Sequence, residues 1–332
     1  MRGRSKELTT RRRRNRCLAT AVTVAAALGV GPVGTAQAGA PSCADGWHAE
    51  VLAADLGGLE NLEDDGRGGF YLSGIVRGEL LHVAADGQVT TIRTGLDNPA
   101  GLRLIGEDLY FVTGDGTTPN GGGTLSRLHL GTGEVTVLLP NLVQPNGLLL
   151  LPDGDLLISQ LSVPWPPVGI SRYRPATGEF TLAWSPVPRP NGLALAPDHQ
   201  AVITEDVATS QLLRVPLDAP DRPTPIATVN DGLLPALDDL DVTAAGLAFV
   251  TGDYSGSVYQ VDPTTGTWCT LATGWTTPRG PLPTPPPIGP TSARLAPDPT
   301  TGAWSLYVTS IDGTLRRLRP PAALDLTPSS LH

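Results

Sequence analysis

The segment PNGLLLLPDG at residues 145–154 decides the fold, because it returns as PNGLALAPDH at residues 190–199. Related phrases, in which a polar residue precedes an apolar run and an Asp/Gly turn, occur at residues 60, 98, 238 and 292. A spacing near 45 residues is what one four-stranded propeller blade requires. Helical periodicity of useful length is absent. The sequence therefore predicts an all-β fold, a six-bladed β-propeller.

The two ends of the repeat predict how the ring closes. The last repeat has only three strands before the chain passes residues 315–318, whereas an extra strand at residues 47–53 precedes the first repeat. We therefore expect the N-terminal strand to complete the last blade, which places Cys43 beside the outer strand of blade five and its Cys269. In an oxidising compartment such a pair is expected to form a disulfide, the alternative being two unrelated thiols.

The first 38 residues are predicted to be a signal peptide. Residues 1–16 carry eight basic side chains and one acidic one, an Ala-rich apolar run follows, and Ala36-Gln37-Ala38 has the small-x-small form of a cleavage site. A membrane anchor is the alternative, but glycines and a proline interrupt the run before the ~20 residues that a span needs. We expect residues 39–332 to be the mature propeller, secreted or held in a periplasm-like space, with Sec or Tat export left open.

Charge narrows the range of partners. The formal net charge of the whole chain is −9. Removal of residues 1–38 takes away eight basic residues and one acidic residue, so the mature chain carries −16. Such a surface argues against nucleic acid and anionic membranes but suits a divalent cation. Lys6 is the only lysine, so lysine-based covalent chemistry is excluded after cleavage.

Polar residues stand at the same place in each repeat. In a propeller, equivalent positions face one another across the central channel, so these residues should form a ring. Its oxygen donors, without His or Cys, favour Ca²⁺, with Mg²⁺, Mn²⁺ or Zn²⁺ as alternatives. The competing interpretation is that the Asn-Gly and Asp-Asp pairs only supply turn chemistry. The expected ring is Glu60, Asn98, Asn146, Asn191, Asp238 and Ser292.

These blade-start motifs resemble those of the senescence marker protein/gluconolactonase family, which includes regucalcin, and more distantly those of paraoxonases. The motifs are Glu60-Asn61-Leu62, the two Pro-Asn-Gly-Leu segments, Leu237-Asp238-Asp239-Leu240 and Pro290-Thr291-Ser292, and the resemblance covers residues 47–320. It implies one divalent cation at the bottom of a central pocket and activity on lactones or related esters. The ligands it implies are Glu60, Asn146, Asn191 and Asp238, with Asp239 additional or supporting.

The sequence also departs from that family. The second repeat reads Asp97-Asn98-Pro99-Ala100 and lacks the Arg-x-Asn phrase with which the sugar lactonases bind substrate. No pair of histidines suits a paraoxonase-like dyad. An aldonolactone substrate is therefore in doubt.

The predicted function is metal-assisted hydrolysis of a small lactone or ester by a monomer. Asp238 is the first choice of general base and Asp239 the second, and the substrate pocket is expected to include Asn98, Ser292 and Trp165. Two segments that break the repeat, 161–169 and 275–290, border the pocket mouth or are plain connectors. The alternatives are a non-catalytic scaffold with a structural Ca²⁺ and a metal-free enzyme resembling strictosidine synthase.

Overall fold

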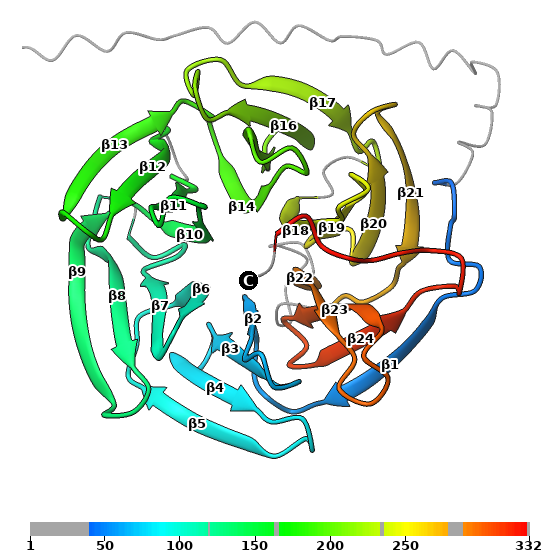
Figure 1. The fold of residues 1–332 in the computed structure, drawn as a ribbon, viewed down its shortest axis with the longest axis horizontal. Coiled ribbons are helices and arrows are strands. Elements are labelled where there is room, and N and C mark those ends of the chain that lie inside the picture. The colour runs from blue at the N-terminus through cyan, green and yellow to red at the C-terminus, as the bar shows by residue number, and fades with distance from the viewer. Residues whose placement is uncertain (1–39, 119, 163–165, 233–235, 278–287, 331–332) are drawn as a thin grey trace, which may run out of the picture. The chain divides into compact units, whose positions relative to one another are not determined.

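The computed structural model describes residues 40–118, 120–162, 166–232, 236–277 and 288–330. In these ranges 24 strands form six four-stranded antiparallel sheets around a common axis (Figure 1). The described residues contain no helix, so none that could cross a membrane. The predicted six-bladed propeller is confirmed.

Blades are numbered in chain order and their strands from the axis outward. The first three blades contain the following strands. They are β2 (Leu62–Asp64), β3 (Phe70–Gly74), β4 (Glu79–Val83) and β5 (Val89–Thr94); β6 (Pro99–Ile105), β7 (Asp108–Thr113), β8 (Gly123–His129) and β9 (Glu134–Leu142); and β10 (Pro145–Leu150), β11 (Leu156–Gln160), β12 (Gly169–Arg174) and β13 (Glu179–Ser185).

Blades 4 to 6 repeat this order, except that the outermost strand of blade 6 comes from the N-terminus. Their strands are β14 (Pro190–Leu195), β15 (Ala201–Asp206), β16 (Gln211–Pro216) and β17 (Thr224–Thr228); β18 (Leu237–Val242), β19 (Ala248–Gly252), β20 (Ser257–Asp262) and β21 (Thr267–Ala272); and β22 (Pro290–Pro297), β23 (Trp304–Ser310), β24 (Leu315–Arg319) and β1 (His48–Ala53).

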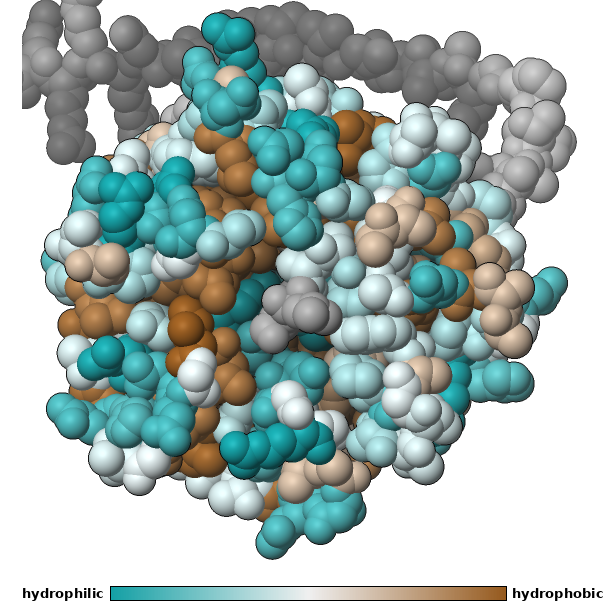
Figure 2. Space-filling view, in the orientation of Figure 1, coloured by the Kyte–Doolittle hydropathy of each residue, from teal (hydrophilic) through white to brown (hydrophobic). Residues whose placement is uncertain are grey.

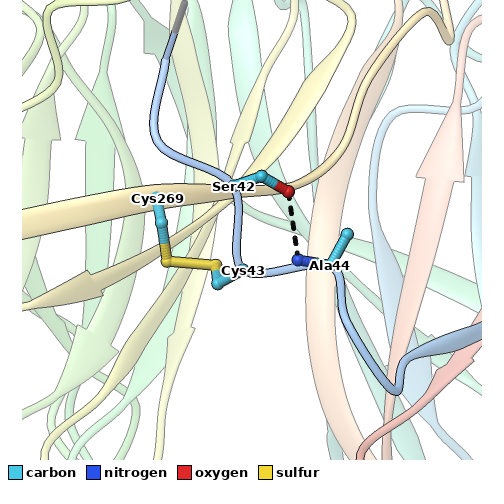
Figure 3. The surroundings of a disulfide bond; sticks show 4 residues. All are labelled: Ser42, Cys43, Ala44 and Cys269. Carbon is cyan, nitrogen blue, oxygen red and sulfur yellow. Dashed lines mark hydrogen bonds between the residues drawn. A yellow bond between two sulfur atoms is a disulfide. The ribbon is translucent and has the colours of Figure 1, made fainter.

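Closure of the ring follows the prediction. Strand β1 pairs antiparallel with β24, from His48 opposite Arg319 to Ala53 opposite Leu315. Just before β1, Ser42 forms a parallel bridge to Thr270 of β21, and Cys43 is disulfide-bonded to Cys269 (Figure 3). The disulfide therefore joins the N-terminal segment to the outer strand of blade 5, as the sequence predicted.

Apolar side chains fill the six gaps between neighbouring blades. Each gap holds one buried cluster, because alternate residues of the strands face the adjacent blade. Between blades 1 and 6, for example, Phe70 packs on Tyr307 with ring centroids 4.4 Å apart. The core is thus distributed around the axis, and the axis itself is left to polar residues.

The segment after β24 runs back to the axis at the end where the inner strands finish (Figure 1). The Ser329 amide donates to Val242 O (2.8 Å) and its hydroxyl donates to Leu195 O (2.7 Å), so this segment ties blade 4 to blade 5. In the same orientation hydrophilic residues cover most of the projecting loops, with hydrophobic residues visible mainly between them (Figure 2).

Candidate functional site

The site begins with an irregularity that most of the inner strands share. In blades 2 to 6 the pairing register between the first and second strand shifts near the start of the first strand. A bulge of this kind redirects side chains and is common beside functional sites. The shifts lie between Pro99 and Leu102, Pro145 and Leu148, Pro190 and Leu193, Leu237 and Leu240, and Pro290 and Ser292.

The strand registers fix which residues occupy equivalent places. In each inner strand we take the first apolar residue that pairs regularly with the second strand, such as Leu148 in blade 3, and count two positions back. In blades 1 to 6 this position holds, in order, Glu60, Ala100, Asn146, Asn191, Asp238 and Thr291. We call these six residues the floor ring. Two expected members are corrected: Asn98 lies two positions too early, and Ser292 lies one too late. Blade 2 has Asn98-Pro99 where blade 3 has Pro145-Asn146, so aligning the two asparagines shifted the second repeat.

The glycines after the floor ring serve close packing of the inner strands. A Cβ on Gly147 would lie 2.3 Å from Asn191 O, and one on Gly101 would lie 2.4 Å from Asn146 O. A Cβ on Gly192 would lie 2.3 Å from Asp239 Oδ1. These three glycines lie inside inner strands and have no positive φ. The interpretation of the Asn-Gly pairs as turn chemistry is therefore wrong.

The floor ring opens into a cavity of about 360 Å³. Its lining includes the four predicted ligands Glu60, Asn146, Asn191 and Asp238, and all four are buried. Asn146 Nδ2 donates to Glu60 Oε1 (3.0 Å), and Asn191 Nδ2 donates to Asp238 Oδ1 (2.5 Å). Blades 3 and 4 thus place an amide against the carboxylates of blades 1 and 5.

Two further carboxylates, Asp115 and Asp253, line the same cavity. Each follows the second strand of its blade, Asp115 after β7 and Asp253 after β19. Sequence reasoning missed both, because it compared only the starts of the inner strands. The equivalent place after each second strand would have revealed them.

Asn98 positions one of these carboxylates. Its backbone is left-handed (φ 36°), and its side-chain Nδ2 donates to Asp115 O (2.9 Å). Its carbonyl accepts from the Gly114 amide (3.1 Å) and from the Asp115 amide (3.3 Å). Asn98 also lines the cavity, as expected, but its contacts hold the turn that carries Asp115.

Burial, together with the charges of neighbouring carboxylates, raises the pKa values of three cavity carboxylates. Burial and then the charges of Asp115 and Asp253 raise the pKa of Glu60 well above its usual value. Burial and then the charges of Glu60 and Asp253 do the same for Asp238. Burial raises the pKa of Asp115 to about 7, although hydrogen bonds from Asn146 and the Gly116 amide lower it. Each group is costly to ionise because nearby negative charges share a desolvated space.

Asp239 lies in the layer beneath this floor. Its Oδ2 accepts from Asn61 Nδ2 (2.9 Å) and from the hydroxyl of Ser292, and its Oδ1 accepts from the Leu240 amide (2.9 Å). Neither Asp239 nor Ser292 is among the residues that line the cavity. Ser292, expected in the substrate pocket, and Asp239, expected as a supporting ligand and second choice of base, therefore both support the floor from below.

A second polar layer lies further along the axis and contains two buried arginines. Arg103 Nη1 donates to Leu102 O (2.6 Å) and to Glu63 Oε2 (3.3 Å). Arg294 is fully buried, 4.0 Å from Glu63 and from Asp241, and within the described part of the chain its guanidinium nitrogens have no hydrogen-bond partner. These arginines balance carboxylates deep in the axis, away from the cavity.

The chemistry of the cavity fits a hard divalent cation. Three of its carboxylates have pKa values raised by burial, and Oδ1 of Asn191 and Oδ1 of Asp115 are buried with no hydrogen-bond partner among the described residues. In the described ranges no three Asp, Glu, His or Cys side chains alone form a metal cluster, so amide oxygens would have to complete the set. Asn146 and Asn191 can supply these by rotating their amides.

The two segments that break the repeat reach the cavity. Leu161 and Ile288, at their described ends, are lining residues. Trp165, expected in the substrate pocket, lies outside the described residues.

No family model and no curated protein matches the sequence. Solved structures do match its fold. A gluconolactonase from Xanthomonas campestris is 16% identical, with a TM-score of 0.66 over 88% of this chain and 99% of that one. The structural neighbours of this chain include gluconolactonase- and regucalcin-like six-bladed propellers.

Two other neighbours mark the range of functions on this scaffold. A calcium-binding regucalcin from Agrobacterium tumefaciens is 18% identical, with a TM-score of 0.62 over 86% of this chain and 98% of that one. A virginiamycin B lyase from Staphylococcus aureus is 12% identical, with a TM-score of 0.55 over 82% and 98%. Likeness at these identities establishes the fold alone, so the activity must be argued from the site.

Proposed function

We propose that the protein is a divalent-metal-dependent hydrolase of lactones or related esters. The observation that carries this proposal is a set of four carboxylates that line one cavity, the buried Glu60, Asp115 and Asp238 and the half-buried Asp253. Such a set is expensive to keep ionised without a compensating cation. Glu60, Asn146, Asn191 and Asp238 would hold the ion, and Ca²⁺ suits their oxygen donors best.

A bound divalent cation would polarise the ester carbonyl and stabilise the negative charge that develops on its oxygen. The protein must then supply a group that accepts the proton of the attacking water. Asp238 and Asp115 both line the cavity, whereas Asp239 does not. The base is therefore assigned to this pair of cavity carboxylates, and Asp239 is assigned a positioning role through Asn61 and Ser292.

Proton transfer by Asp115 is consistent with its surroundings. Without a cation, burial raises the pKa of Asp115 to about 7, and a cation bound nearby would lower it, so the carboxylate would be ionised near neutral pH. It could then take a proton from water and pass it to the leaving alkoxide. Asp238, held by Asn191 at 2.5 Å, is better suited to binding the ion. Replacement of either should lower kcat, and Asp238→Asn should weaken binding of the cation more than Asp115→Asn does.

The experiment combines stability with turnover. Thermal unfolding of the mature protein is measured with EDTA and with added Ca²⁺, together with hydrolysis of a panel of lactones and aryl esters. Asp238→Asn should lose both the Ca²⁺-dependent rise in melting temperature and the turnover. Asp153→Asn, a mostly exposed carboxylate that pairs with Arg172 on the surface, serves as the matched control and should lose neither.

Two outcomes would favour the rival functions. Ca²⁺-dependent stability without turnover of any substrate would indicate a scaffold with a structural ion. A melting temperature that changes with neither EDTA nor Ca²⁺, together with no turnover, would contradict the metal site and favour metal-free chemistry in the same cavity.

The proposal includes a location. We propose that residues 1–38 are removed during export, a step supported by the cleavage-type sequence before residue 39 and by the Cys43–Cys269 disulfide. N-terminal sequencing of protein recovered outside the cytoplasm should begin at residue 39. An intact N-terminus on exported protein would contradict it.

A further inference from the structure

A second ring of equivalent positions surrounds the cavity above the floor ring. It is formed by the residue directly after the second strand of each blade, where the chain turns toward the third strand. Blades 1, 3, 4 and 6 place a branched aliphatic residue there, and all four line the cavity. We call these four residues the aliphatic collar: Ile75, Leu161, Val207 and Ile311.

The polar members of this ring are confined to two blades. Blade 5 has Asp253 at the collar position, and blade 2 has Gly114, followed by Asp115. Because blades 2 and 5 lie opposite each other, the carboxylates divide the collar into two aliphatic faces, one on blades 3 and 4 and one on blades 6 and 1 (Figure 1).

More apolar surface continues outward from the collar. Val76 and Tyr254, the next residues in blades 1 and 5, line the same cavity and are 69% and 36% exposed. An exposed large apolar side chain carries information when it belongs to a larger apolar surface around a site. The other exposed large apolar side chains of the described residues lie on outer strands, among them Leu182 of β13.

We infer that the collar binds an alkyl or aryl group of a neutral substrate, so that the preferred substrate is an apolar lactone or ester and not a sugar lactone. This inference rests on the proposed function, and it names the class of substrate for that same cavity. The floor would receive the ester group, and the collar would receive the hydrocarbon attached to it.

Hydrogen bonding favours this class over a polyhydroxylated one. Four collar side chains offer no donor or acceptor, so sugar hydroxyls placed against them would lose water without replacement. Methylene groups against the same side chains gain free energy from burial. The described lining contains no Lys, Arg or His, while it contains four carboxylates, so an anionic substrate would also be repelled.

The experiment uses γ-lactones that differ only in alkyl chain length, from γ-butyrolactone to γ-decalactone, with glucono-1,5-lactone as the polar comparison. Burial of each added methylene should raise kcat/KM by up to about fourfold until the collar is filled. Leu161→Ser should flatten this dependence on chain length. Leu182→Ser, the same change on the exposed outer strand of the same blade, should leave it unchanged.

Binding is measured separately, as the rise in melting temperature that each lactone produces in the wild type and in both variants. A chain-length dependence in binding without turnover would keep the collar as an apolar site while the hydrolase proposal fails. Turnover that is independent of chain length, or best with glucono-1,5-lactone, would overturn the collar inference and leave the hydrolase proposal standing. The absence of both binding and turnover would overturn both the collar inference and the hydrolase proposal.

Discussion

Neutralising one cavity carboxylate should stabilise the metal-free protein, although the same change should harm function. The change is Asp115→Asn. Moving the pKa of Asp115 from 3.8 to about 7 costs the folded state about 4 kcal/mol once the carboxyl is ionised in both folded and unfolded chains. An asparagine keeps the shape without that charge.

The pH dependence follows from the direction of the change. The folded state binds the Asp115 proton more tightly than the unfolded state does. Protonated Asp115 therefore contributes its full stabilisation below about pH 4, and this contribution is lost as the pH rises through 7. In EDTA at about pH 8, Asp115→Asn should therefore be more stable than the wild type by up to about 4 kcal/mol, and near pH 4 the difference should vanish. Ca²⁺ should stabilise the wild type more than the variant.

Urea unfolding at both pH values, with EDTA or Ca²⁺, measures these differences. Asp298→Asn is the matched control with the opposite sign. Burial alone would raise the pKa of Asp298, but hydrogen bonds from the Thr300 amide (2.8 Å) and Arg319 Nε (3.0 Å), and then the charge of Arg317, lower it. This variant should lose stability at about pH 8. A lower stability of Asp115→Asn than of the wild type in EDTA at that pH would show that the Asp115 charge does not destabilise the metal-free fold.

Three further changes probe the frame around the cavity. Replacing Cys43 and Cys269 by Ser opens a loop of 226 residues and should lower the free energy of unfolding by about 2–5 kcal/mol. The urea midpoint should fall, and reductant should no longer change it. Equal midpoints with and without reductant in the wild type would contradict this. Arg294→Met should lower the free energy of unfolding by about 3–5 kcal/mol, because it leaves the buried Glu63 and Asp241 without the positive guanidinium. An unchanged urea midpoint would mean that these carboxylates are protonated. Gly192→Ala should cost about 1–3 kcal/mol, since its Cβ would meet the Asp239 backbone at 2.6 Å, whereas Gly154→Ala, with open space around it but a positive φ, should cost less.

The repeat made the fold predictable, because each blade carries the same turn and strand signals and only ring closure can protect all their edges. The disulfide followed from that closure. The gathering of Glu60, Asn146, Asn191 and Asp238 around one cavity was predictable for the same reason: a position repeated in sequence becomes a ring in space.

Other parts of the site could not be predicted from the repeat. The bulges that shift the pairing in the inner strands are set by close packing, so two ring members were misaligned by one or two residues. Asp115 and Asp253 belong to turns whose lengths differ between blades and lie outside the inner-strand motif. The shared sequence FVTGD at residues 111–115 and 249–253 is the signal that could have indicated them. The buried guanidinium of Arg294 carries no local signal, since its neighbours Glu63 and Asp241 come from other repeats or strands.

The pairing of β1 with β24 also governs when the protein can become complete. Glu50, near the beginning of the propeller, pairs with Arg317, which is made 267 residues later. A growing chain therefore carries an unmatched first strand, and its sheets stay uncapped until synthesis is almost finished. Contacts between such distant parts of a chain slow folding. Chaperones that hold the chain, or delivery across a membrane before folding, would protect it during that interval, and a chain interrupted before β24 would leave open strands ready to pair with other copies.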